Sequence, residues 1–179
     1  MIYLETSRLL IRDWIETDLE PFKLLNADVQ VMQYFPKTLT HDETDIFYEM
    51  IQAEFRKHGF GLYAIEVKDN KEFIGFIGFH LATFNADFTP CREIGWRLKK
   101  DAWGKGYATE GAKACLEYGM KQLGFNEVYS FTAEINKPSH HVMEKIGLRF
   151  VKDFNHPQIV SGSPLVKHVL YHISRKKVV

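Results

Sequence analysis

The sequence is poor in cysteine, with only Cys91 and Cys115 among its 179 residues. The two do not form a C-x-x-C pair, and the 8 histidines include no H-E-x-x-H spacing. Neither a disulfide scaffold nor a zinc site is therefore indicated, and we predict that the protein holds no metal.

The sequence also lacks net charge and long hydrophobic runs. Its 23 Lys and Arg balance 23 Asp and Glu, so we expect neither nucleic acid nor an anionic membrane as a partner. No apolar run approaches the roughly 18 to 20 residues that span a bilayer. The opening MIYLETSRLL has no basic start followed by a long apolar run, so no signal peptide is expected and the predicted location is cytoplasmic.

What is present is the composition of a globular protein, 45% apolar and 26% charged, which predicts one domain over residues 1–179. Alternating patterns predict seven strands, at 9–14, 62–68, 73–81, 93–98, 128–135, 149–155 and 165–174. Helices are expected after capping boxes at Thr17 and Thr40, and over 28–33, 107–123 and 137–146. This alternation predicts an α/β (α+β) protein in which helices cover both faces of a mixed sheet.

Residues 93–110, EIGWRLKKDAWGKGYATE, are the most informative stretch. The strand that opens it has two faces, with Ile94, Trp96 and Leu98 on one and Glu93, Gly95 and Arg97 on the other. Gly104 and Gly106 allow a tight turn whose N–H groups are unobstructed by Cβ atoms. A helix follows from Tyr107, and the unpaired N–H groups of its first turn favour an anion.

The anion is not bound by a common nucleotide motif. Tyr107 and Ala108 follow Gly106 where a P-loop needs Lys and Ser or Thr, and the G-x-G-x-x-G offset also fails. The run W-G-K-G-Y-A-T-E after E-I-G-W-R-L instead resembles the coenzyme A pyrophosphate loop of the GNAT superfamily of N-acetyltransferases. The family pattern Q/R-x-x-G-x-G/A falls on Trp103, Gly106 and Ala108, and an aromatic residue at the first position is usual in the ribosomal-protein (RimJ/RimL-type) branch.

The resemblance implies an acyl-CoA N-acyltransferase fold with a mostly antiparallel sheet of about seven strands. It also implies acetyl-CoA as the acetyl donor. The cofactor-binding residues that it implies are Trp96, Arg97, Leu98, Trp103, Gly104, Lys105, Gly106, Tyr107, Ala108, Thr109, Asn136 and Ser139.

A second segment, N-x-x-S-x-x-x-x-E-K-x-G from Asn136 to Gly147, resembles the last motif of the same family. There the Asn bonds the pantetheine arm, and the Ser lies near the thioester sulfur. Asn136 and Ser139 are equally good helix-start residues, so a purely structural interpretation stays open. Met143 replaces the Tyr that many members use as the general acid, and the branch implies Ser139 as its catalytic substitute.

Acetylation needs a neutral amine, and the pKa of an α-amine is about 8 whereas that of lysine is about 10.4, so a base matters more than an acid. Family members often have a Glu here that orients a water, and we predict Glu93 as the catalytic base. The alternative is a carboxylate that pairs with Arg92 or Arg97. Tyr34, Phe35 and His168 are either acceptor contacts or ordinary core and surface residues.

The predicted function is transfer of an acetyl group from acetyl-CoA to a primary amine, by direct attack in a ternary complex. The acceptor would be a protein N-terminal α-amine or a small-molecule amine, and the protein a monomer or homodimer. A non-catalytic coenzyme A-binding sensor or interaction module is the alternative that Met143 favours. A nucleotide-phosphate binder is disfavoured by the missing Lys-Ser/Thr pair.

Overall fold

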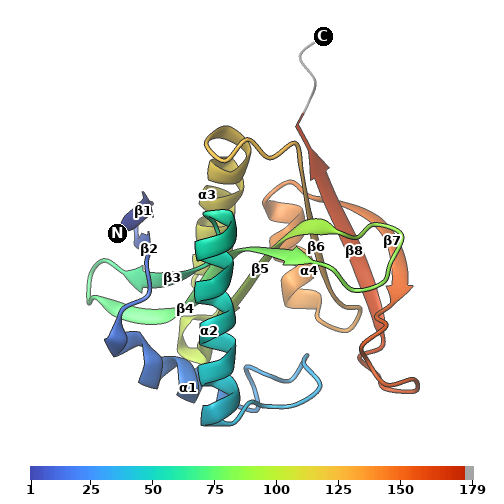
Figure 1. Ribbon diagram of the computed structural model, residues 1–179, viewed down its shortest axis with the longest axis horizontal. Helices are drawn as coiled ribbons and strands as arrows, with labels where there is room; N and C mark the ends of the chain where they lie inside the picture. Colours follow the sequence, from blue (N-terminus) through green and yellow to red (C-terminus); the bar gives the residue numbers. More distant parts are fainter. Residues whose placement is uncertain (176–179) are drawn as a thin grey trace.

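The computed structural model describes residues 1–175, and it contains one eight-stranded sheet in the order β1-β2-β3-β4-β5-β6-β8-β7 (Figure 1). The strands are β1 (Ile2–Glu5), β2 (Leu9–Arg12), β3 (Leu62–Val67), β4 (Glu72–Ala82), β5 (Cys91–Leu98), β6 (Glu127–Ala133), β7 (Arg149–Asn155) and β8 (Lys167–Ser174). All neighbours are antiparallel except β5 and β6, which run parallel. The expected mixed, mostly antiparallel sheet is confirmed, with β1 added at its edge.

Helices cover both faces of the sheet, as expected. One face carries α1 (Leu19–Ala27) and α2 (His41–His58), and the other carries α3 (Tyr107–Lys121) and α4 (Lys137–Lys145). Short 3-10 turns, η1 (Glu16–Asp18) and η2 (Lys100–Ala102), precede α1 and α3. One apolar cluster lies on each face of the sheet. Because strand side chains alternate, Tyr63 and Ile65 of β3 pack in the cluster under α3, whereas Leu62 and Ala64 pack in the cluster under α1 and α2.

The two predicted capping boxes have different outcomes. The one at Thr40 is confirmed, since Thr40 Oγ1 accepts from Glu43 N at 3.2 Å and Glu43 Oε2 accepts from Thr40 N at 2.9 Å. The box at Thr17 is wrong, because the neighbouring Asp18 carboxylate accepts from Ile15 N at 3.0 Å and begins the helical segment instead.

The expected short helix at 28–33 is also wrong, since this segment forms a series of turns. Asp28 Oδ1 accepts from Gln30 N at 2.7 Å and from Val31 N at 3.2 Å. An aspartate that bonds the backbone just ahead of it competes with helix formation. The α1–α2 connection is therefore an irregular loop.

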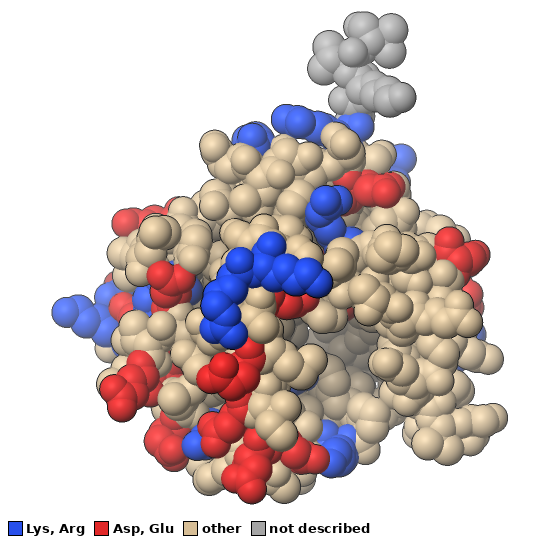
Figure 2. All heavy atoms as spheres, viewed as in Figure 1, with Lys and Arg blue, Asp and Glu red and all other residues tan. Residues whose placement is uncertain are grey.

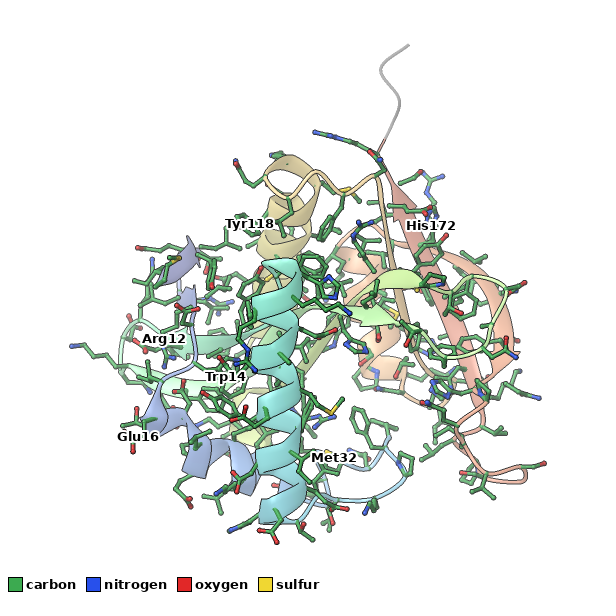
Figure 3. All side chains as sticks on the ribbon, viewed as in Figure 1. Arg12, Trp14, Glu16, Met32, Tyr118 and His172 are labelled. Carbon is green, nitrogen blue, oxygen red and sulfur yellow. The ribbon has the colours of Figure 1, made fainter. Side chains whose placement is uncertain are left out.

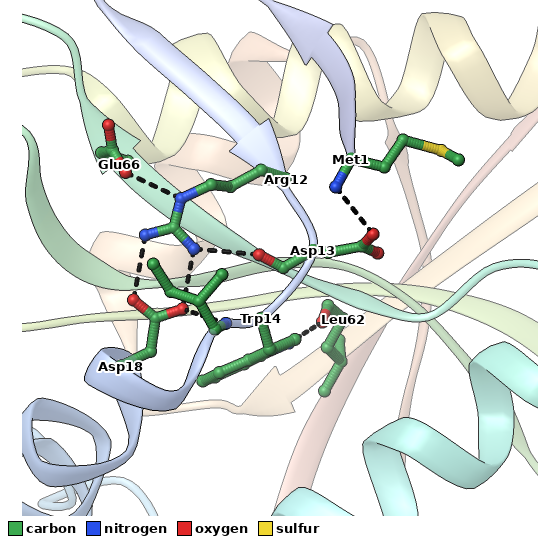
Figure 4. A network of polar contacts seen from close by, with 8 residues as sticks. Met1, Arg12, Asp13, Trp14, Asp18, Leu62 and Glu66 are labelled. Atoms are coloured by element: carbon green, nitrogen blue, oxygen red, sulfur yellow. Dashed lines mark hydrogen bonds and ion pairs between the residues drawn. The ribbon is translucent and has the colours of Figure 1, made fainter.

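A buried ion-pair network holds the start of α1 against the sheet (Figure 4). Arg12 donates from Nη1 and Nη2 to Asp18 at 2.7 and 2.9 Å, and from Nε to Glu66 at 2.7 Å. Arg12 is 8% exposed and Asp18 1%. Water therefore cannot replace either partner.

We expect Asp18→Ala to lower the free energy of unfolding by about 3 kcal/mol, because it leaves a buried guanidinium short of a counter-charge. Urea denaturation measures the change. Glu117→Ala, which breaks the exposed Glu117–Lys121 pair on α3, is the matched control and should change stability by about 0.5 kcal/mol or less. Equal losses in both variants would contradict a structural role for the network.

β5 and β6 separate soon after they meet. They share one register pair, Glu93 with Tyr129, and Ser130 Oγ donates to Ile94 O at 2.8 Å. On its other edge, β5 pairs with β4 along the whole length of β5, from Cys91 to Leu98. Beyond Gly95, the edge of β5 toward β6 has no strand partner in the described part of the chain, so its main-chain groups face an opening in the sheet.

Candidate active site

The glycine turn lies at the carboxyl end of β5, where the sequence predicted it. Gly104 and Gly106 have φ of +71° and +81°, and Gly106 is the N-cap of α3. Trp103 Nε1 donates to Leu98 O at 2.8 Å, which fastens the turn to the end of the strand. The turn and the first residues of α3 therefore present a group of main-chain N–H donors.

Arg8 holds the turn from the other side, and sequence reasoning missed it. Its Nη1 donates to Lys105 O at 2.8 Å, its guanidinium lies 4.6 Å from the centre of the Tyr107 ring, and it pairs with Glu110 at 2.6 Å. These contacts join segments about a hundred positions apart, so no local signal could have revealed them. The N-terminal segment thus helps to shape the turn.

The side chains of β5 alternate as predicted. Ile94, Trp96 and Leu98 pack in the apolar cluster under α3. Arg97 points to the opposite face, where its Nη1 donates to Asn26 Oδ1 at 2.6 Å. The side chains of Trp96, Arg97 and Leu98 thus occupy the two faces of the sheet, and only their main chain borders the opening.

Glu93 belongs to a cluster of three ionisable side chains on the face that α2 covers. His80 is its cross-strand neighbour on β4, and His80 Nδ1 lies 2.8 Å from Glu54 Oε1 of α2. The same Glu54 oxygen accepts from Leu81 N at 3.2 Å. Glu54 and His80 were not anticipated, because nothing in their spacing distinguishes them from ordinary helix and strand residues.

Burial raises the pKa of Glu93 to about 8, with the Glu54 charge adding to the increase and His80 opposing it. The hydrogen bond to Glu54 raises the pKa of His80. A carboxyl group with a pKa near 8 is a stronger base than an ordinary glutamate at neutral pH. Glu93 can therefore both accept and release a proton under physiological conditions.

Neither arginine considered as a partner for Glu93 pairs with it. The Arg92 guanidinium lies 4.7 Å from the centre of the Phe125 ring, and Arg97 bonds Asn26. Within residues 1–175, Glu93 makes no ion pair. The structure therefore does not support the alternative in which Glu93 is a salt-bridged surface carboxylate.

Asn136 begins α4 and is 8% exposed. Its Oδ1 accepts from Ser139 N at 3.4 Å, and its Nδ2 donates to Thr132 Oγ1 at 2.8 Å. Ser139 is partly buried, and Met143 is 1% exposed in the core. Asn136 is thus the N-cap of α4, as its position in the sequence allowed. Its contact with the pantetheine arm stays a prediction.

Aromatic and histidine side chains pack together on the other side of the opening, a group that sequence reasoning did not assemble. They come from β6, β7, β8, the β7–β8 connection and the loop after β4: Phe84, Phe88, Tyr129, Phe131, Phe154, His156 and His168. Burial lowers the pKa of His168 to about 4, so it is neutral in this packing. The space-filling view shows a hollow between α2 and the C-terminal strands, bordered largely by uncharged residues (Figure 2).

The α1–α2 connection borders the same region. Figure 3 shows Met32 of this connection near the lower end of α2 and His172 near the upper end of β8. Phe35 is 38% exposed, and its ring centre lies 4.2 Å from the Arg97 guanidinium. Glu93 and Tyr129 therefore lie where β5 and β6 meet, at the closed end of the site. Arg97 and Phe35 lie on the β5 side, and Phe131 lies on the β6 side.

Among residues 1–175 there is no group of three or more His, Cys, Asp and Glu side chains placed to hold a metal ion. The same residues contain no helix that is both long and apolar enough to cross a membrane.

Known proteins share this architecture. The family model of the acetyltransferase (GNAT) domain matches residues 8–149. The uncharacterized N-acetyltransferase YnaD of Bacillus subtilis is 30% identical over 149 residues, which cover 83% of this chain and 83% of that protein. The crystal structure of a GNAT-family acetyltransferase from Bacillus anthracis has a TM-score of 0.79 and 28% identity, covering 97% of this chain and 98% of that one.

Mycobacterium smegmatis RimJ, solved with a coenzyme A disulfide, has a TM-score of 0.76 and 18% identity over 95% of this chain and 83% of that one. The fold and the match to the family model thus define an acyltransferase. The chain belongs to the GNAT acetyltransferase family and is an N-acetyltransferase. The likeness to the RimJ/RimL-type branch is confirmed at the level of the fold.

Proposed function

We propose that this N-acetyltransferase takes its acetyl group from acetyl-CoA and transfers it to a primary amine by direct attack in a ternary complex. The observation that carries the proposal is the edge of β5 that is unpaired beyond Gly95, up to the glycine turn, within the described residues. A strand edge can hydrogen-bond an extended amide-containing chain such as pantetheine. The coenzyme A bound by the similarly folded RimJ supports the same use of the fold.

In this proposal, the main-chain N–H groups of the turn bind the pyrophosphate. The residues that supply them are Gly104, Lys105, Gly106, Tyr107, Ala108 and Thr109. Trp103 borders the turn without adding a donor, because its own N–H donates to Lys100 O at 3.0 Å. The main chain of Trp96, Arg97 and Leu98 borders the pantetheine arm, with Asn136 across the opening. A main-chain N–H of β5 would polarise the thioester carbonyl.

The amine nitrogen attacks the carbonyl carbon while Glu93, directly or through a water, accepts the proton that the amine loses. The C–S bond then breaks, and coenzyme A leaves as a thiolate. The pKa of a thiol is about 8.5, so a thiolate leaves with only a hydrogen bond to assist it. Met143 is buried and cannot donate a proton, which leaves Ser139 or water as the donor.

Isothermal titration with acetyl-CoA, followed by measurement of thiol release over a panel of amines and peptides, tests the proposal. We expect micromolar binding and thiol release that depends on the amine. Absence of both heat and a thermal shift at millimolar acetyl-CoA would refute acetyl-CoA as the donor. Binding without thiol release from any amine would refute the catalytic part.

A further inference from the structure

Arg97 is a cation with an incomplete set of partners. Its Nη1 donates to Asn26 Oδ1, but its Nε is buried and has no hydrogen-bond acceptor. No acceptor for Nη2 is present in the described part of the chain, and no carboxylate lies close enough to pair with the group. In guanidinium geometry, Nε and Nη2 form one edge, which is the edge that a carboxylate or phosphate engages with two parallel hydrogen bonds.

Packing around Arg97 is aromatic rather than acidic. Its guanidinium lies 4.2 Å from the ring centre of Phe35, 5.6 Å from that of Phe47 and 5.3 Å from that of Phe76. Burial lowers its pKa to about 9, the direction expected of a cation that has lost water without gaining a counter-charge. Holding such a charge is costly for the fold, so a ligand that neutralises it is a physical reason for its presence.

Arg97 lies on the same strand face as Glu93, four residues away. At about 3.3 Å per residue their Cα atoms are about 13 Å apart. Both side chains face the α1–α2 side of the sheet, whereas Ile94 and Leu98 face α3. A molecule whose amine reaches Glu93 therefore extends along β5 toward Arg97 and the half-exposed Phe35.

We propose that Arg97 binds an anionic group, a carboxylate or a phosphate, carried by the amine acceptor. The inference rests on the proposed function and names the acceptor class, an amine with an anion several bonds away from the reacting nitrogen. The glycine turn supplies separate donors for the phosphates of coenzyme A, which leaves Arg97 to the acceptor.

The test compares kcat/KM for matched acceptors that differ only in the anion. One pair is a tripeptide with a free C-terminal carboxylate and the same tripeptide as its amide, and a second pair is a phosphorylated alkylamine and its alcohol. We expect the wild type to prefer the anionic member by about 10- to 100-fold, as for a charge-assisted pair of hydrogen bonds. The substrate pair with the larger preference shows whether Arg97 binds a carboxylate or a phosphate.

Arg97→Gln should bring the preference close to unity while the KM for acetyl-CoA changes by less than about threefold. Arg97→Lys keeps the charge without the planar edge and should retain part of the preference. It also provides the comparison if the glutamine variant folds poorly. Lys113→Gln, which removes an exposed cation from α3, is the matched control and should keep the wild-type preference.

Three outcomes would overturn the inference. The wild type could turn over both members of each pair equally, or prefer a polyamine such as spermidine to any anionic acceptor. Arg97→Gln could instead raise the KM for acetyl-CoA and slow both acceptors alike, which would assign Arg97 to the cofactor. Failure of the proposed function is distinct, because the wild type would then release no thiol with any amine.

Discussion

Glu93→Gln is expected to lower kcat at pH 7 by about 100-fold or more, the usual contribution of a general base. The affinity for acetyl-CoA should change by less than about twofold, because the side chain faces α2 and His80 rather than the turn. Steady-state kinetics and titration calorimetry separate the two effects. Glu117→Gln, an exposed carboxylate on α3, controls for the loss of a charge.

The role of Glu93 as the base also predicts how kcat changes with pH. Because the pKa of Glu93 is about 8, the carboxylate that acts as base is the minor form at pH 7 and becomes the major form above pH 8. The wild-type kcat should therefore rise with pH and level off above about 8, and Glu93→Gln should lose this rise. Equal turnover of the wild type from about pH 6 to 9 would exclude Glu93 as the base.

The free energy of unfolding should also depend on the ionisation of Glu93. The pKa of Glu93 is higher in the folded protein than the ordinary glutamate value of 4.5, so its contribution to stability is full below that value and is lost as pH rises toward 8. Glu93→Gln stays neutral, and its stability should fall less than that of the wild type between about pH 5 and 9. Thermal unfolding at the two pH values measures the difference.

Gly106→Val should weaken acetyl-CoA binding by about 10- to 100-fold. Residue 106 has φ of +81°, where a β-branched side chain costs about 1–3 kcal/mol, and its Cβ would lie 3.4 Å from Arg8 Nη2. In the proposed function, the added methyl groups would also stand where the pyrophosphate approaches the N–H donors of the turn. Calorimetric titration with acetyl-CoA measures the loss of affinity.

Gly124→Val is the matched control for backbone strain. Residue 124 has φ of +71°, follows α3 and has no atom within 4 Å of the position that a Cβ would occupy. Both variants should lose stability, but only Gly106→Val should lose acetyl-CoA affinity. Unchanged affinity in Gly106→Val would show that the turn is not the phosphate site.

The elements that the sequence predicted correctly are those whose signals are local. The Thr40 capping box and the hairpin of β3 and β4 each depend on contacts between residues close in the chain. The errors arose where side chains compete for the same backbone. Asp28 bonds the backbone ahead of it and stops a helix. Asp18, which Arg12 of β2 also holds, accepts from Ile15 N, so the helical segment begins after Ile15 and not at Thr17.

The sequence by itself determined the glycine turn, the two faces of β5 and the family, because spacing and residue type over residues 93–110 suffice for these. Only the tertiary structure decided the surroundings of Glu93 and Arg97. His80, Glu54 and Asn26 come from other elements, and their effects depend on burial and distance. Burial and proximity shift the pKa of Glu93 and leave Arg97 without a counter-charge, and both effects arise only when the chain folds.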